Sequence, residues 1–151
     1  MPMDRVRLGG ELTRIATTGR GERPTPVASS DFRNQLARTH ATHFNERIDN
    51  ALVEIEQLGQ RLGESLTTGD LRRYREAIGR LFRDLTHHMM EVRADLEWDA
   101  QTWEQRTMVT IRKVDEKLEE LSNLVLEQEQ DRLGILEAIG EIKGLLVDVR
   151  M

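Results

Sequence analysis

One long apolar stripe in the C-terminal part of the sequence limits the folds that this chain can adopt. Between residues 111 and 149, apolar side chains recur at alternating spacings of three and four, which places them along one side of a helix. Because so regular a stripe must be buried by other helices, we predict an all-α fold, an antiparallel bundle of three to four long helices. The stripe consists of Ile111, Val114, Leu118, Leu121, Val125, Ile135, Ile139, Ile142, Leu146 and Val149.

The composition fits one domain with a narrow aliphatic core. Hydrophobic residues make up 38% of the 151 residues and charged residues 32%, and only six residues are aromatic (three Phe, two Trp and one Tyr). The absence of cysteine excludes disulfides and thiolate metal sites and fits a reducing compartment. No apolar run approaches the roughly 20 residues of a membrane span, and the N-terminus lacks the apolar segment of a secretory signal. We therefore expect a cytoplasmic protein without membrane contact.

The N-terminal segment differs in composition from the rest of the chain. Residues 1–29 are rich in Gly, Pro, Thr and Ser and show no helical period, so we predict a flexible, disordered N-terminal tail there and a helical bundle domain at residues 30–151. Five Arg against three acidic residues give the tail a net charge of +2, whereas 17 basic and 24 acidic residues give the remainder −7. The tail is either a docking arm or an idle terminus.

Capping signals place the first helices. We expect the first helix to begin near Ser30 or Asp31 and to end before Gly69, which would take the left-handed conformation of a helix terminus. Asp70 would then cap the second helix, and the third would begin near Trp103. The turn before the second helix is so short that the first two helices must form an antiparallel hairpin.

The last part of the stripe has two interpretations. A helix beginning at Trp103 and antiparallel to the second helix would reach the end of the bundle near residue 130, so the final residues fold back or overhang. We favour a fold-back fourth helix capped by Asp131 over one unbroken helix whose stripe would need a second chain. Gly140 and Gly144 would allow another helix to approach closely, inside the bundle or across a dimer.

The motifs VDEKLEEL (Val114 to Leu121) and IGEIKGLLVDV (Ile139 to Val149) stand out in the second half of the chain. They resemble motifs of the YaaR family, which comprises small helical bacterial proteins. The likeness covers roughly residues 46–151, with no such match over residues 1–45. It implies an all-α cytoplasmic protein and supplies no catalytic residue. The matching positions are Leu71, Tyr74 and Ile78, then Trp98-Asp99, Arg106 and Ile111, then VDEKLEEL (Val114 to Leu121) and IGEIKGLLVDV (Ile139 to Val149).

All four histidines fall at one level of the predicted hairpin, which raises the question of a metal site. His43 with Glu46 and His88 with Glu91 are both i, i+3 pairs, and imidazole with carboxylate suits zinc or iron in a bundle. In the alternative interpretation, His88 is a core residue, whereas His40, His43 and His87 lie on the surface. The hypothesis names His43, His88, Glu46 and Glu91 as metal ligands, and we expect no cofactor.

Five arginines make the second helix basic. Arg72, Arg73, Arg75, Arg80 and Arg83 could form an anion or nucleic-acid patch, or could pair with the acidic run Asp115, Glu116, Glu119 and Glu120. We favour the pairing and expect no nucleic-acid partner, because no aromatic residues interleave the arginines and the net charge is −5.

No nucleophile, phosphate loop or triad stands out, so we expect no enzyme. The leading hypothesis is a cytoplasmic protein-interaction module that binds an unknown protein partner and could self-associate as a homodimer. The alternative is a metal- or pH-responsive sensor built on the histidine layer between the first two helices. Trp98 and Trp103 would either anchor a partner or plug the end of the bundle.

Overall fold

The computed structural model describes residues 26–93 and 98–151, and side chains from residue 30 to 92 and from 101 onward. Four α-helices follow one another in this part of the chain: α2 (Pro26–Ser65), α3 (Thr68–Arg93), α4 (Trp98–Leu126) and α5 (Arg132–Leu146), with a short 3-10 helix η1 (Val147–Val149). The predicted all-α helical bundle is confirmed. None of these helices is both long and apolar enough to cross a membrane.

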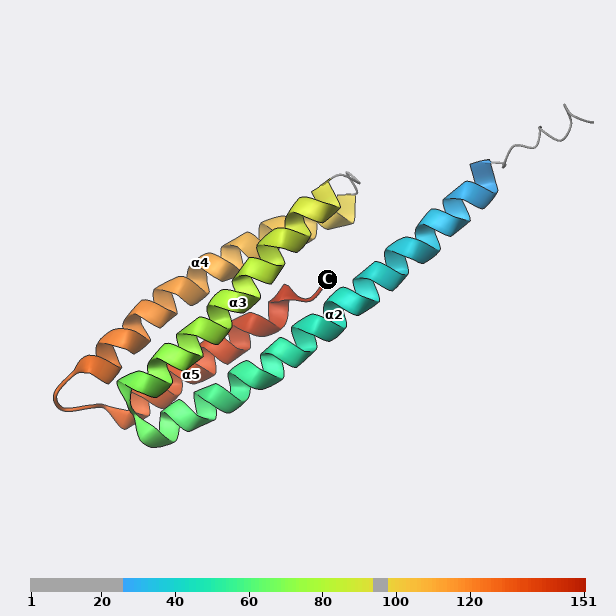
Figure 1. The fold of residues 1–151 in the computed structure, drawn as a ribbon. Coiled ribbons are helices and arrows are strands. Elements are labelled where there is room, and N and C mark those ends of the chain that lie inside the picture. The colour runs from blue at the N-terminus through green and yellow to red at the C-terminus, as the bar shows by residue number, and fades with distance from the viewer. Residues whose placement is uncertain (1–25, 94–97) are drawn as a thin grey trace, which may run out of the picture. The chain divides into compact units, whose positions relative to one another are not determined.

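The chain divides into two units, Met1–Thr42 and His43–Met151. The first contains the beginning of α2, whose described side chains there, including Phe32 and Leu36, are exposed apart from the half-buried Ala41. Of the predicted flexible tail at residues 1–29, residues 1–25 lie outside the described residues. The second unit contains the rest of α2 together with α3, α4 and α5, which run side by side (Figure 1).

The core of the second unit is built by the stripe that the sequence predicts. Leu118, Leu121, Ile142 and Leu146 are buried, and Ile139 is half-buried against them. The last helix folds back along α4 as predicted, so the stripe closes on itself within one chain (Figure 1). Other buried apolar side chains come from α2 and α3: Phe44, Ile48, Ile55, Leu62, Leu71, Tyr74, Ile78, Leu81, Leu85 and Met89.

The turn between α4 and α5 needs no glycine, because side chains satisfy its backbone. The Asp131 carboxylate accepts a hydrogen bond from the Gly134 N–H at 3.0 Å, which confirms Asp131 as the N-cap of α5. The Gln130 amide nitrogen donates to the carbonyl oxygens of Leu66 and Val125, each at 2.8 Å. Gln130 thus ties the end of α4 to the neighbouring α2–α3 turn.

The predicted ends of the first helices are corrected. The α2 helix begins at Pro26, where a missing N–H is tolerated in the first turn. Leu66, not Gly69, takes the left-handed conformation (φ 55°), and its N–H donates to the Leu62 carbonyl at 2.8 Å. The cap of α3 is Thr67, not Asp70, because the Thr67 hydroxyl accepts from the Asp70 N–H at 3.2 Å. The α4 helix begins at Trp98, five residues before the predicted start at Trp103.

Candidate functional site

His88 is a buried member of an aromatic cluster at one end of the bundle. Its ring stacks on that of Phe44 with centroids 3.7 Å apart and planes 8° apart. Trp103 meets both rings edge-on, with centroid distances of 5.7 Å to Phe44 and 5.6 Å to His88. Stacked and edge-to-face rings stabilise a core beyond the area that they bury. The cluster therefore joins α2, α3 and α4 at this level.

The last residues of the chain close over this cluster. The Trp103 indole N–H donates to the Val149 carbonyl at 2.9 Å, which favours the interpretation of Trp103 as a plug. The Met151 sulfur lies 3.0 Å from His88 Nε2, and the Met151 N–H donates to the Asn45 side chain at 3.0 Å. The described part of the chain does not include the Trp98 side chain.

The residues of the hypothetical metal site are not gathered as predicted. His43, Glu46 and His87 are exposed on their helices, and Phe44 occupies the position opposite His88 that the hypothesis gives to His43. Glu91 approaches His88, with 3.5 Å between its Oε1 and the imidazole Nδ1. His40 lies in the other unit and is exposed. Among the described residues, no group of three or more His, Cys, Asp or Glu side chains could hold a metal ion. The geometry favours a structural His88.

An apolar groove runs between α2 and α5, and no described residue of α4 lines it. It encloses about 380 Å³. Val53, Leu136 and Val147 stand on its edges with 56%, 44% and 59% of their surface exposed. Tyr74 from α3 lies beneath it, and burial raises the pKa of the Tyr74 hydroxyl above its ordinary value of 10.0. An ion pair of Lys143 with Glu56 bridges α5 and α2 beside the groove.

Two pairs of glycines, one on α2 and one on α5, have different surroundings, and Gly59 and Gly140 line the groove. A Cβ at Gly59 would lie 3.1 Å from Ile139 and from Tyr74, and one at Gly63 would lie 2.7 Å from Leu136, so these glycines allow α2 to approach α5. Around Gly140 and Gly144, by contrast, a Cβ would meet nothing within 4 Å. Close packing inside the bundle, one of the two interpretations that the sequence allowed, therefore does not explain Gly140 and Gly144.

The predicted pairing of the α3 arginines with the acidic run of α4 is wrong. Arg73 pairs with Asp70 at 2.8 Å within α3, and Arg80 pairs with Glu54 of α2 at 2.9 Å. Arg75 donates to the Ser122 hydroxyl of α4 at 2.8 Å instead of to a carboxylate. Glu120 of the acidic run pairs with Lys117.

The fold and the groove define the class of protein: an all-α bundle with an apolar surface groove between two of its helices. More specifically, the chain belongs to the family described as "Protein of unknown function (DUF327)", whose model matches residues 11–150. This match and a relative named YaaR, reported below, together confirm the resemblance to the YaaR family. The match extends well before residue 46, so the expectation of no likeness over residues 1–45 is wrong from residue 11 onward.

Two relatives support this assignment. The chain is 26% identical over 125 residues to "Uncharacterized protein YaaR" from Bacillus subtilis (strain 168), a match that covers 83% of this chain and 85% of the relative. It is also similar to the crystal structure of uncharacterized protein BH1478 from Bacillus halodurans, with 25% identity and a TM-score of 0.64. That likeness covers 79% of this chain and 97% of the other. Both relatives are named as uncharacterised, so the similarity supports family and fold and assigns no activity.

Proposed function

We propose that this chain is a non-enzymatic protein-interaction module of the cytoplasm that self-associates through the α2–α5 groove. The observation that carries the proposal is the open face of α5 at Gly140, where a Cβ would meet nothing within 4 Å. A glycine inside a helix destabilises it by about 1 kcal/mol relative to alanine, and nothing within the described bundle offsets that penalty here. Close approach of a helix from outside would offset it.

The shape of α5 favours a second copy of this chain as the occupant. Leu136 of α5 and Val147 of the adjoining η1 are exposed. Gly140 and Gly144, where a Cβ would meet nothing within 4 Å, leave a hollow between them. If two α5 helices pack antiparallel about a two-fold axis between residues 141 and 142, Leu136 of each copy lies opposite the second copy's Val147. Both copies then bury the same face, as a two-fold interface requires.

The partner would also cover apolar surface that water now contacts. Val53 of α2 lies on the other edge of the groove, so a helix seated on α5 would bury it as well. Protruding apolar side chains beside a hollow provide the shape complementarity of a specific interface. The cysteine-free sequence agrees with a cytoplasmic setting.

Sedimentation equilibrium of the wild-type chain and the variant Gly140→Leu tests the proposal. We expect the wild type to dimerise and Gly140→Leu to weaken dimerisation at least tenfold, because the new side chain fills the hollow. The variant's monomer should remain folded, since leucine suits a helix better than glycine and its Cβ would meet nothing within 4 Å. The control Asn123→Leu, at an exposed position of α4, should dimerise like the wild type.

Two outcomes would overturn self-association through the α2–α5 groove. One is a wild-type chain that stays monomeric at every concentration, which would leave the groove to a different occupant. The other is a Gly140→Leu variant that dimerises as tightly as the wild type, which would place the dimer interface elsewhere.

A further inference from the structure

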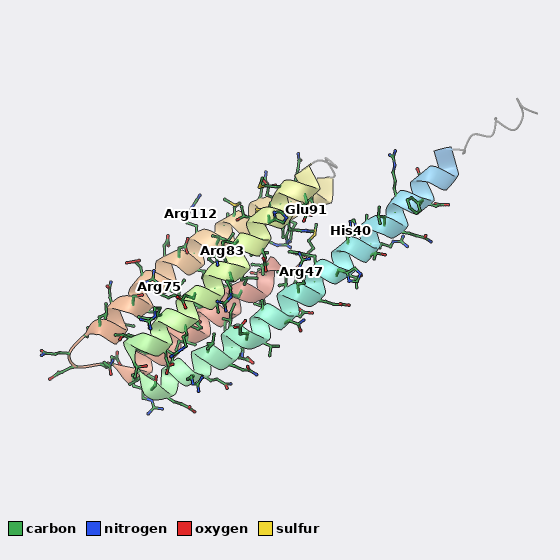
Figure 2. All side chains as sticks on the ribbon, in the orientation of Figure 1. His40, Arg47, Arg75, Arg83, Glu91 and Arg112 are labelled. Atoms are coloured by element: carbon green, nitrogen blue, oxygen red, sulfur yellow. The ribbon has the colours of Figure 1, made fainter. Side chains whose placement is uncertain are left out.

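A second concave surface lies on the outer face of α3, away from the α2–α5 groove. It is an open, shallow concavity of about 800 Å³, and its lining includes Arg72, Arg75, Glu76, Gly79, Arg80 and Arg83 (Figure 2 labels Arg75 and Arg83). Four cationic side chains and one carboxylate thus line one concavity of a chain whose net charge is −5. So local an excess of positive charge in an acidic protein indicates an anionic ligand.

The partners of these arginines leave cationic groups available. Arg75 is held by the Ser122 hydroxyl, which orients a guanidinium without neutralising it. Arg80 shares its charge with Glu54. Arg72 and Arg83, at the two ends of the concavity, have no ion-pair partner in the part of the chain that the structure describes.

Gly79 forms the floor of the concavity. A Cβ there would meet only the Arg83 guanidinium, at 3.8 Å, so the glycine is not required by packing. Its φ is not positive, so the backbone does not require glycine either. A glycine in the middle of a helix destabilises it relative to alanine. An absent side chain at this position does, however, let a ligand reach the helix surface between the arginines.

We propose that this concavity binds a small ligand that carries two or more linked phosphate groups. The guanidinium group presents a planar fork of N–H donors that matches phosphate oxygens. Arg72 and Arg83 are eleven residues apart, or about 16 Å along the helix, so a ligand with several phosphate groups can contact more of these arginines at once than a single phosphate can. No aromatic side chain lines the concavity, which disfavours single-stranded nucleic acid because its bases need a stacking surface.

Calorimetric titration with tripolyphosphate tests this site on the full chain at moderate salt. We expect the wild type to bind and the double variant Arg72→Gln/Arg83→Gln to bind at least tenfold more weakly. The control Arg112→Gln/Lys113→Gln removes the same charge from an exposed stretch of α4 and should bind within twofold of the wild type. Gly79→Leu, which fills the floor and changes no charge, should also weaken binding at least tenfold. Thermal melts establish that each variant is folded.

Titrations with orthophosphate, ATP and single-stranded RNA distinguish a polyphosphate site from the alternative ligands. Orthophosphate should bind at least tenfold more weakly than tripolyphosphate, and ATP about as tightly as tripolyphosphate. No binding by the wild type, or equal loss in the site variant and the α4 control, would overturn the proposal. Tighter binding of single-stranded RNA than of tripolyphosphate would assign the surface to nucleic acid instead. None of these results depends on whether the chain dimerises through α5.

Discussion

Thr107 places a polar hydroxyl in the apolar core. Its side chain is fully buried in α4, and its hydroxyl has no hydrogen-bond partner within the described residues. A buried hydroxyl without a partner lowers stability, because the water that it loses on folding is not replaced.

We therefore predict that Thr107→Val stabilises the protein by about 1 kcal/mol, since valine has nearly the same shape and needs no hydrogen bond. The midpoint of urea unfolding should rise. Thr86→Val is the control: its exposed hydroxyl donates to the Phe82 carbonyl, so that variant should be neutral or slightly destabilised. A lower midpoint for Thr107→Val would show that the hydroxyl has a role in the fold.

The histidines also show, at the scale of single residues, what spacing predicts and what it misses. Sequence spacing placed His43 and His88 at nearly the same level of the hairpin, and the level was correct. Adjacent helical positions differ by about 100° in direction, however, and it is Phe44 that faces His88. Sequence spacing therefore predicts the level of a side chain along a hairpin more reliably than it predicts the direction in which that side chain points.

At the scale of elements, α5 is the helix on which both the core and the groove depend. Its inner face carries Ile142, which is fully buried, and its outer face carries Leu133, which is 67% exposed. A matched pair of substitutions within this helix separates the two faces.

We predict that Ile142→Ala destabilises the protein by about 2–5 kcal/mol, because it leaves a cavity at the centre of the stripe. Leu133→Ala should change the free energy of unfolding by no more than about 0.5 kcal/mol, as is usual for surface positions. Urea unfolding of both variants at low protein concentration measures this difference. Equal losses would mean that α5 does not pack as described.

The elements show which sequence signals were informative. The stripe and the Asp131 cap predicted the fold-back of α5, because burial and capping agreed there. The start of α3 was misplaced because Thr67 and Asp70 are both good capping residues, and only the observed hydrogen bond distinguishes them.

The groove between α2 and α5 was missed because Leu136 and Val147 lie outside the main stripe. The open glycines were noticed in the sequence, but their surroundings depend on tertiary packing.

At the scale of the whole molecule, the described titratable groups predict a loss of stability in alkali. Burial raises the pKa of Tyr74, and contacts with Glu141 and Glu120 raise the pKa of Lys117. In the unfolded chain, Tyr74 ionises near pH 10.0 and Lys117 near pH 10.5, whereas the folded protein holds both protons to higher pH. The free energy of unfolding should therefore fall as the pH rises above these values.

Tyr74→Phe tests the sign of this effect. Phenylalanine has no proton to lose, so the variant should lose less stability than the wild type between about pH 9.5 and 11.5. Urea unfolding at several pH values gives the two slopes. Equal slopes would show that Tyr74 ionises as readily in the folded protein as in the unfolded chain.

The central claim about the molecule is that the Gly140 face of α5 meets the same face of a second copy. Because the chain contains no cysteine, Gly140→Cys introduces a single reactive thiol there, and Asn123→Cys provides a matched exposed thiol on α4. A short bis-maleimide should convert Gly140→Cys to a covalent dimer much faster than Asn123→Cys. Equal rates of cross-linking for the two variants would contradict self-association through α5.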